Sequence, residues 1–335
     1  METVLQTYNL EIGYRVGGEK KSVAAGINIS LYKGELVCLL GANGKGKSTL
    51  LRTLAGNQPA LAGEVKINGQ EIGSVSKRKL AKLMSLVYTD HTQAGGLTVR
   101  ELVELGRQPH TGFLGRLDAE DKAIVEKALA DAGIAHKAND FVAELSDGER
   151  QKAMIARALA QETPIIFLDE PTAFLDVASK IETMRLLHRL ARENNKAILL
   201  SSHDVSQALR LADRLITIDA AGKLNCGVTE QMVVSGELAQ LFDASRIRFE
   251  AQEGNFYACE KYRAKASVES GSETVKMWIK NALRRNLFEL VESEAEIKIK
   301  ETPEGGFEMI VNNGTAEKFS CIGELSERLN NLQIK

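Results

Sequence analysis

A glycine-rich octapeptide, Gly41–Ser48 (GANGKGKS), constrains the fold of this 335-residue chain more than any other segment. It follows the apolar run Leu36–Leu40 and leads into the helical pattern Lys47–Leu54, so it marks a turn from a buried strand into a helix. Glycines let the backbone wrap closely around phosphate oxygens, and N–H groups at a helix N-terminus attract the same anion. The spacing G-x-x-x-x-G-K-[ST] therefore predicts a nucleotide-phosphate site in an α/β protein, with a ligand-free glycine-rich turn as the alternative.

Within this segment Lys47 would neutralise the β- and γ-phosphates, and the Ser48 hydroxyl would hold Mg²⁺. The predicted phosphate-binding residues are Gly41, Asn43, Gly44, Gly46, Lys47, Ser48 and Thr49. Alone, the motif indicates a nucleotide and little more.

A second apolar run, Ile165–Leu168, ends in two acids, Asp169 and Glu170. Strand ends of this kind lie at the carboxyl edge of a sheet, where open α/β proteins bind ligands. We expect Asp169 to join the shell of the Mg²⁺ and Glu170 to act as general base toward an attacking water. The alternative is a solvated strand end without a ligand. The pair of acids followed by Pro171 and Thr172 disfavours this alternative.

Residues Leu145–Glu149 (LSDGE) introduce a long helical pattern that runs to Ala160. Ser146 with Glu149 three residues later is a capping-box pattern, so a simple helix start is one interpretation. A helix N-terminus with serine and glycine is also suited to a γ-phosphate. The segment resembles the LSGGQ signature of ABC ATPases, and it lies between the other two motifs as it does in that family.

The resemblance covers about residues 1–245, and it implies ATP and Mg²⁺ as ligands. It implies that Ser146, Asp147, Gly148 and Glu149 contact the nucleotide held by a second copy of the chain. By the same resemblance Tyr14 would stack on adenine, with a core or turn tyrosine as the alternative. Asp176, in AFLD, matches the D-loop between protomers, and His203, after the apolar strand Ala197–Leu200, matches the histidine that contacts the γ-phosphate.

One segment departs from the family pattern. ABC ATPases usually carry a glutamine at the end of the strand that opens the helical subdomain, whereas this chain reads LVYTDH from Leu86. Asp90 occupies the matching position and is predicted to join the metal shell, with Thr89 and Gln93 as alternatives. An acid there would add charge near phosphates.

The resemblance is strongest to importer ATPases for siderophores, haem and cobalamin, through Glu101–Thr111 (ELVELGRQPHT), the acids of 118–121 and SSHDVSQALRLADR from Ser201. It implies a homodimer that closes on two ATP molecules, transmembrane permease subunits, an indirect substrate-binding protein partner, and a peripheral place at the cytoplasmic face of the inner membrane. Residues 107–111 would face the membrane subunits, or form a plain surface loop. The alternative functions are an ABC ATPase for another substrate, a soluble ABC ATPase of translation or repair, and a regulatory protein.

Composition agrees with these expectations. The net charge of −2 disfavours a general nucleic-acid binder, which needs clustered basic residues. Four scattered cysteines (Cys38, Cys226, Cys259, Cys321) without C-x-x-C spacing predict neither a disulfide framework nor a zinc site. Apolar runs of about five residues are far shorter than the ~20 that cross a bilayer, and no signal peptide is visible. We therefore expect a soluble protein of the reducing cytosol.

The alternation of strand and helix patterns predicts an α/β core with βαβ units. The resemblance implies that this is a P-loop NTPase (RecA-like) core with antiparallel β and helical subdomains. We place the ATPase domain at 1–248, with its helical subdomain at about 91–160, and a small C-terminal α+β domain at 249–335. In the latter we expect a hairpin at 247–258, an amphipathic helix at 275–290, strands at 297–299 and 307–311, and a final helix at 322–329.

Overall fold

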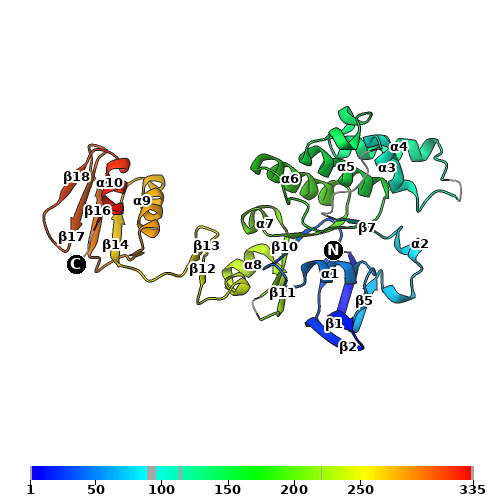
Figure 1. Cartoon of the computed structure of the whole chain (residues 1–335), viewed down its shortest axis with the longest axis horizontal. Helices are drawn as coiled ribbons and strands as arrows, with labels where there is room; N and C mark the ends of the chain where they lie inside the picture. The colour runs from blue at the N-terminus through cyan, green and yellow to red at the C-terminus, as the bar shows by residue number, and fades with distance from the viewer. Residues whose placement is uncertain (1, 89–95, 113–114, 220, 333–335) are drawn as a thin grey trace. The chain divides into compact units, whose positions relative to one another are not determined.

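The computed structural model describes residues 2–88, 96–112, 115–219 and 221–332. The chain divides into two compact units, Met1–Tyr257 and Ala258–Lys335 (Figure 1). Each unit has a hydrophobic core of its own. Among the described residues, no helix is long and apolar enough to span a membrane.

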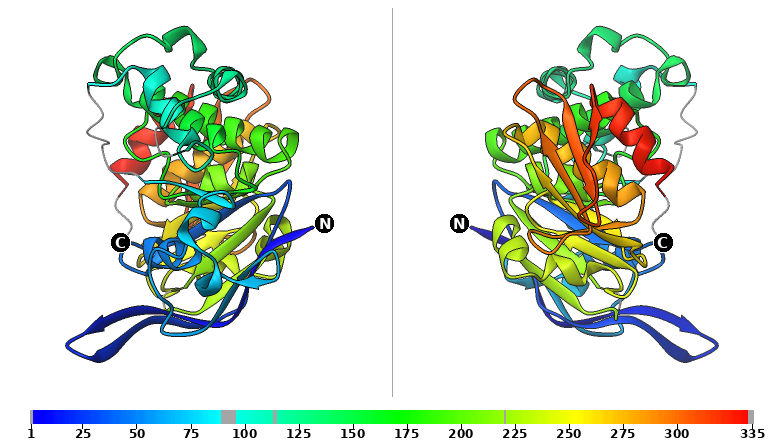
Figure 2. Two further views of the ribbon diagram at one scale, coloured as in Figure 1. Left: turned by 90° about the vertical axis from the view of Figure 1, so that its right-hand side faces the viewer. Right: turned by 90° about the vertical axis from the view of Figure 1, so that its left-hand side faces the viewer.

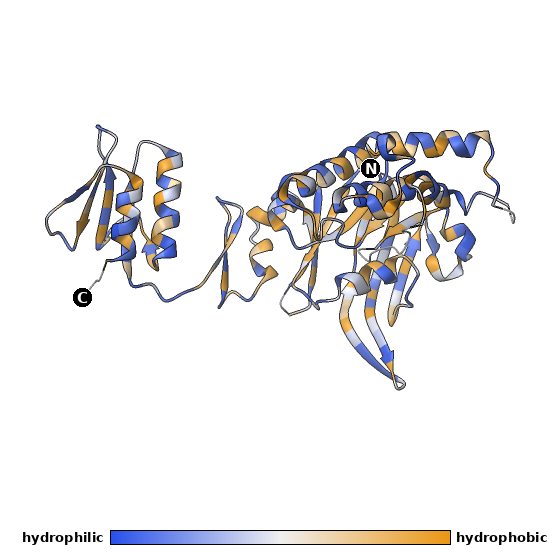
Figure 3. Ribbon diagram, turned by 45° about the horizontal axis from the view of Figure 1, so that its top comes forward, coloured by the Kyte–Doolittle hydropathy of each residue, from blue (hydrophilic) through white to orange (hydrophobic). Residues whose placement is uncertain are grey.

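A six-stranded sheet forms the centre of the first unit, in the order β11-β10-β4-β9-β8-β7. Its strands are β4 (Leu36–Gly41), β7 (Met84–Val87), β8 (Ile165–Leu168), β9 (Ala197–Ser202), β10 (Arg214–Ile218) and β11 (Leu224–Val228). All neighbours pair in parallel except β11, which is antiparallel to β10. Every residue of β4, β8 and β9 is buried, and apolar residues predominate in all three strands (Figure 3).

A second, antiparallel sheet covers one face of this centre. It contains β1 (Thr3–Val16), β2 (Glu19–Ile27), β3 (Ser30–Tyr32), β5 (Ala62–Ile67) and β6 (Gln70–Glu71). Helix α1 (Lys47–Leu54) shares a core with both sheets, to which it contributes Leu50 and Leu51. Strand β4 alternates between two cores, because Leu39 faces this layer while Leu40 faces the helices on the other side.

Helices cover the opposite face of the six-stranded sheet. Those that contact its strands are α5 (Asp147–Ala160), α6 (Val177–Glu193) and α7 (Val205–Leu211), and α3 (Val99–Glu104) and α4 (Ala119–Asp131) pack on α5. Helix α8 (Thr229–Val234) packs beside β10 and β11, and α2 (Lys77–Leu80) lies elsewhere in the unit. Short 3₁₀ segments are η1 (Ile72–Ser74), η2 (Leu105–Arg107), η3 (Ala135–Lys137), η4 (Val142–Glu144) and η5 (Leu238–Leu241). Figure 2 shows helices of residues 99–160 at one end of this unit and the β1–β2 hairpin at the other. The predicted fold class is confirmed.

The first unit ends later than the sequence boundary after residue 248. The hairpin of β12 (Ile247–Glu250) and β13 (Asn255–Ala258) packs its phenylalanines on the first unit's core. The ring centroid of Phe256 lies 4.9 Å from that of Phe242 and 4.8 Å from that of Phe249. These aromatic contacts attach the hairpin to the first unit, which therefore continues to Tyr257.

The second unit is a five-stranded sheet in the order β15-β14-β16-β17-β18 with two helices. Its elements are β14 (Ala264–Glu269), α9 (Glu273–Arg285), β15 (Phe288–Leu290), β16 (Ile297–Glu301), β17 (Phe307–Val311), β18 (Glu317–Phe319) and α10 (Ile322–Asn330). The predicted single helix to residue 290 is wrong at its end. Helix α9 stops at Arg285, Leu287 has a left-handed φ of 63°, and the buried Phe288 starts a strand.

Candidate nucleotide site

The phosphate loop lies between β4 and α1, as the sequence predicts. Gly44 and Gly46 have φ values of 76° and 96°, which L side chains rarely adopt. A Cβ on Gly46 would also lie 2.3 Å from Cγ1 of Val23. Glycine at this position therefore lets the chain turn directly into α1 and present the helix N-terminus at the sheet edge.

The Lys47 side chain is buried inside this loop, with 5% of its surface exposed. Its ammonium donates to the carbonyl oxygen of Gly41 at 2.8 Å and lies 4.0 Å from Oε1 of Glu170. Burial lowers the pKa of Lys47, and the nearby charges of Glu170 and Asp169 oppose that shift. A phosphate entering the loop would supply the anionic partner that a buried ammonium requires.

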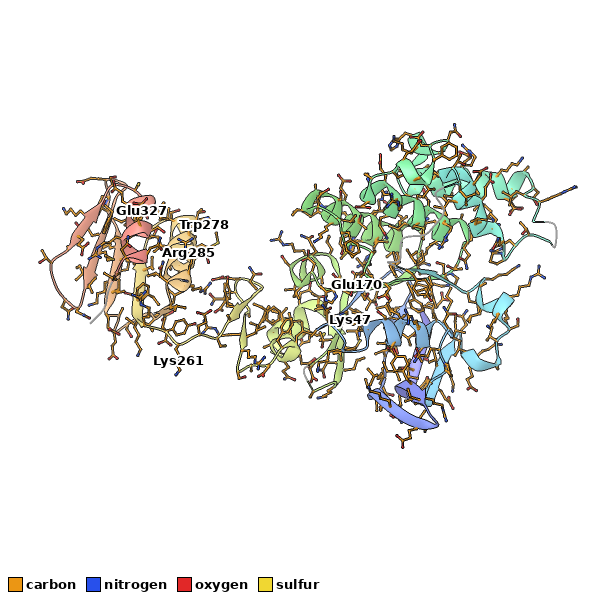
Figure 4. All side chains as sticks on the ribbon, in the orientation of Figure 1. Lys47, Glu170, Lys261, Trp278, Arg285 and Glu327 are labelled. Atoms are coloured by element: carbon orange, nitrogen blue, oxygen red, sulfur yellow. The ribbon has the colours of Figure 1, made fainter. Side chains whose placement is uncertain are left out.

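Glu170 follows β8 with a left-handed φ of 49°, a conformation that costs about 1–3 kcal/mol for a residue other than glycine. Its Oε1 is hydrogen-bonded to Nε2 of His203, and Nδ1 of His203 lies 3.5 Å from Nζ of Lys47. Figure 4 shows Lys47 and Glu170 next to each other in the first unit. A cation, a carboxylate and an imidazole from three separate segments thus converge at one edge of the sheet.

Asp169 is almost fully buried at the same edge, with 9% exposure. Its Oδ1 accepts a hydrogen bond of 2.7 Å from the hydroxyl of Ser201. The same hydroxyl oxygen accepts from the backbone N–H of Glu170 at 2.8 Å. Sequence reasoning missed this role of Ser201, although a polar residue that ends an apolar strand beside two acids is a usable signal.

Tyr14 lies beside the start of α1, where its hydroxyl makes a 2.6 Å hydrogen bond with Oγ1 of Thr49. Thr49 is buried, whereas the tyrosine is 43% exposed. The bond holds an aromatic ring near the phosphate loop with part of its surface open, an arrangement that allows stacking on a base.

The signature residues form a complete capping box at the start of α5. The carboxylate of Glu149 accepts from the backbone N–H of Ser146 at 2.9 Å and from its hydroxyl at 2.8 Å. These bonds lower the pKa of Glu149. Asp147 pairs with Arg150 at 3.1 Å, and both Ser146 and Asp147 are exposed. The chain therefore presents this helix start to solvent, where another molecule can reach it.

Asp176 caps α6 beside the signature. Its carboxylate accepts from the backbone N–H and the hydroxyl of Ser179, both at 2.9 Å, and these bonds lower its pKa. A Cβ on Gly148 would lie 3.1 Å from Oγ of Ser179. The predicted D-loop and the predicted signature are therefore adjacent, and glycine at 148 keeps them close.

Arg107 begins the segment that the sequence predicts either to face membrane subunits or to form a plain surface loop, and its side chain points into the protein. It is 4% exposed, and its Nε donates to Oδ1 of Asp121 at 2.8 Å. Its Nη1 donates to Ala160 O at 2.7 Å and to Glu162 Oε2 at 2.8 Å. Arg107 thus joins three parts of the helical subdomain. The predicted metal residue Asp90 and its alternatives Thr89 and Gln93 lie outside the described residues.

The chain is similar to known proteins. The profile of the family described as "ABC transporter" matches residues 24–173. The iron(3+)-hydroxamate import ATP-binding protein FhuC of Bacillus subtilis is 38% identical over 238 residues, which cover 71% of this chain and 87% of that protein. The ferric enterobactin transport ATP-binding protein FepC of Escherichia coli is 37% identical over 236 residues, covering 70% and 85%.

Similarity extends to an uncharacterized ABC transporter ATP-binding protein of Methanocaldococcus jannaschii, 39% identical over 253 residues, with 76% of this chain and 86% of that protein covered. The chain belongs to the ABC transporter ATP-binding proteins, a family of ATPases. Among solved structures, CbiO1 of Clostridium perfringens, part of the complex CbiONQ, has a TM-score of 0.62 at 26% identity and covers 71% of this chain and 94% of its own. The dimeric bacterial cassette MJ0796 has a TM-score of 0.55 at 29% identity, with 63% and 93% covered.

Proposed function

We propose that this ATPase powers the import of an iron–siderophore, haem or cobalamin-type compound through a membrane permease. The observation that carries the hydrolytic part is the convergence of Lys47, Glu170 and His203 within hydrogen-bond or ion-pair distance. The cargo class rests on the importers FhuC and FepC, whose names refer to iron chelates. An ABC ATPase for another substrate, or one without a transport role, is the alternative.

In the proposed reaction, the glycine loop and Lys47 hold the ATP phosphates while Tyr14 stacks on the adenine. The oxygen of a water molecule bonds to the γ-phosphorus as the bond from that phosphorus to the β–γ bridging oxygen breaks. Glu170 takes the proton of the water, and ADP leaves with the bridging oxygen. His203 keeps the base oriented through the hydrogen bond between its Nε2 and Glu170, and Nδ1 is the ring nitrogen left to contact the γ-phosphate.

The residues at the sheet edge fit Mg²⁺. The carboxylate of Asp169 and the hydroxyl of Ser48 are hard oxygen ligands of the type that this ion prefers. Among the described residues no group of three His, Cys, Asp or Glu side chains could hold a metal, so phosphate and water oxygens would complete the shell. When bound, the ion supplies positive charge to the phosphate oxygens. We also retain Asp90 as a candidate ligand by its place in the sequence.

Two copies are proposed to close head-to-tail on two ATP molecules, since the exposed start of α5 offers N–H groups to a γ-phosphate. Ser146, Gly148 and their neighbours Asp147 and Glu149 would meet the nucleotide held by the second copy, with Asp176 at the interface. The dimeric cassette MJ0796 supports this assembly. Closure would move permease subunits from the cytoplasmic face of the membrane. A substrate-binding protein would deliver the cargo to the permease on the opposite side of the membrane.

The second unit is proposed to regulate or strengthen dimerisation rather than to perform chemistry. Its described residues contain no metal-binding group of His, Cys, Asp or Glu, and its core is small. A domain of about 80 residues is marginally stable on its own, so docking on another surface would add stability. A passive appendage is the alternative. The chain's charge of −2 disfavours nucleic acid as the partner.

The test of the proposed hydrolysis is Glu170→Gln, because an amide cannot accept the proton of the water. We expect kcat to fall by about 10²–10⁴, with ATP affinity retained and an ATP-bound dimer on size exclusion. Vesicles containing the matching permease should then take up cargo with the native chain and not with the variant. Native turnover in Glu170→Gln would refute the assignment of the base, and ATP hydrolysis without uptake of any iron or cobalt chelate would refute the cargo class.

A further inference from the structure

Ser201 lies at the carboxyl end of β9, fully buried and next to the two acids of the site. Strands β8 and β9 are parallel, and Leu168 pairs with Leu200. The next residue in the chain is Asp169 after Leu168, just past the end of β8, and Ser201 after Leu200. The register of the sheet, set by the apolar residues before them, therefore delivers this hydroxyl to the site.

The single hydroxyl of Ser201 serves both acids. It donates its proton to Oδ1 of Asp169 at 2.7 Å, and its oxygen accepts from the N–H of Glu170 at 2.8 Å. A serine has one proton and two lone pairs, so the bond to the carboxylate fixes which lone pair faces the N–H. Because Ser201 has no exposed surface, water has no access to replace it.

The bond to the Glu170 N–H acts at a strained point of the backbone. Glu170 has a φ of 49°, and such conformations persist only where the surroundings hold them. The left-handed turn sends the Glu170 side chain toward His203 and Lys47. Releasing the N–H would let the backbone relax and move the carboxylate away from the position in which it contacts both.

We propose that Ser201 is a positioning residue that sets the orientation of both acids, Asp169 toward the metal and Glu170 toward the water. This rests on the proposed roles of those acids in hydrolysis. Serine donates no proton to the substrate and touches no reacting atom. Its contribution is to couple the metal ligand to the base through one buried hydroxyl.

The first test compares Ser201→Ala with Ser202→Ala, its matched control. Ser202 is the next residue of β9, is also buried, and its hydroxyl accepts from the N–H of Asp204 at 3.0 Å instead. Loss of a charge-assisted bond predicts a fall in kcat of about 10- to 100-fold for Ser201→Ala, with KM for ATP within about threefold. Ser202→Ala should stay within about threefold in both quantities, and Ser201→Thr, which keeps the hydroxyl, should recover most of the rate.

Equal effects of Ser201→Ala and Ser202→Ala on kcat, or a native kcat in Ser201→Ala, would overturn the proposal. If Ser201→Ala does not fold, as judged by thermal unfolding, Ser201→Cys replaces it. A thiol is somewhat larger than a hydroxyl and forms weaker hydrogen bonds, so a native kcat in Ser201→Cys would also overturn the proposal.

The second test needs no hydrolysis. ATP affinity is measured as a function of free Mg²⁺ concentration in Glu170→Gln, with and without the additional change Ser201→Ala. The quantity compared is the Mg²⁺ concentration at which half of the increase in ATP affinity is reached. We expect an increase of about threefold to tenfold, since Asp169 loses the bond that orients it. An unchanged Mg²⁺ requirement would refute the part of the proposal that concerns Asp169. Failure of Glu170 as the base is read separately, from turnover in Glu170→Gln alone.

Discussion

The two units of the chain treat electrical charge in opposite ways. The first buries charged side chains at chosen points, among them Lys47, Arg107 and Asp169. Among the described residues of the second, no charged side chain is buried. Burying a charge is costly unless it is paired, so each buried charge of the first unit reports a specific partner or ligand.

The second unit instead arranges its charges as a solvated surface. Glu269 and Lys300 lie 3.9 Å apart, and Glu308 and Lys318 lie 3.3 Å apart across neighbouring strands. Exposed pairs of this kind contribute about 0–1 kcal/mol each. The apolar residues on the other face, such as Ile297 and Met309, form its core. The contrast teaches that a buried charge indicates a specific partner or ligand, whereas an exposed ion pair alone identifies no site.

The largest effect should come from breaking the buried pair of Arg107. Replacing Arg107 by Met leaves Asp121 without its charged partner, which predicts a loss of about 3–5 kcal/mol in the free energy of unfolding. Denaturant titration of the variant measures it. A loss below about 1 kcal/mol would mean that the burial of charge in this unit has no energetic consequence, contrary to the comparison.

The same pair predicts a pH dependence. The hydrogen bond from Arg107 lowers the pKa of Asp121, so the folded state favours the ionised carboxylate. The stability from this pair is fully present above the unfolded pKa of about 4 and is lost as the pH falls below it through the lowered folded pKa. Unfolding measured between about pH 6 and pH 2 should show a weaker acid dependence in Arg107→Met than in the native chain.

The next effect is on ligand binding. Lys47→Ala removes the ammonium from the phosphate loop and should weaken ATP binding by about 10- to 100-fold, through loss of charge-assisted bonds. Stability should change little or rise, because a buried cation without its phosphate is removed. Calorimetric titration and thermal unfolding give the two readouts. Unchanged ATP affinity would contradict the assignment of the loop.

A small effect is expected for the counterpart in the second unit. Arg328 makes two bonds to Glu317, at 2.7 and 2.9 Å, with side chains 37% and 41% exposed. Although these bonds lower the pKa of Glu317, solvent screens the pair. Arg328→Met should therefore cost about 1 kcal/mol or less, measured as for Arg107→Met. If Arg328→Met lowered the free energy of unfolding as much as Arg107→Met does, the contrast between buried and exposed charges would be contradicted.

The sequence predicted features whose signals are contiguous. The phosphate loop, the strand that ends at Asp169 and the helix start at Ser146 each lie within a few residues. The contacts of Ser201 and Arg107 were not predicted, because strand register or helix packing brings together partners that lie more than ten residues apart in the chain. A residue's hydropathy does not report such long-range partners.

Local patterns also misled at two boundaries. The apolar period of α9 continues through Leu287 and Leu290, yet a left-handed residue redirects the chain into a strand. Periodicity records which side chains are apolar, whereas the helix end depends on a backbone angle. The first unit ends at Tyr257 and not at residue 248 for a related reason. Phe249 and Phe256 pack on the core formed by the preceding part of the chain.

The smallest effect on nucleotide chemistry should come from removing the whole second unit. A chain ending at Tyr257 keeps the phosphate loop, both acids and the complete core of the first unit. We expect its ATP affinity to match the native value within about twofold, because no residue of the proposed site is lost. A chain ending at Arg248 also loses Phe249 and Phe256, whose packing predicts a further cost of about 1–3 kcal/mol in unfolding free energy.

Comparison of these two truncations separates the hairpin from the second unit. If both chains unfold at the same denaturant concentration, the hairpin does not contribute to the stability of the first unit. ATP-induced dimerisation, followed by size exclusion in the Glu170→Gln background, then measures what the second unit adds. A chain ending at Tyr257 that dimerises less tightly than the full chain supports the proposed regulatory role. Equal dimerisation and equal transport would mean that the second unit affects neither step.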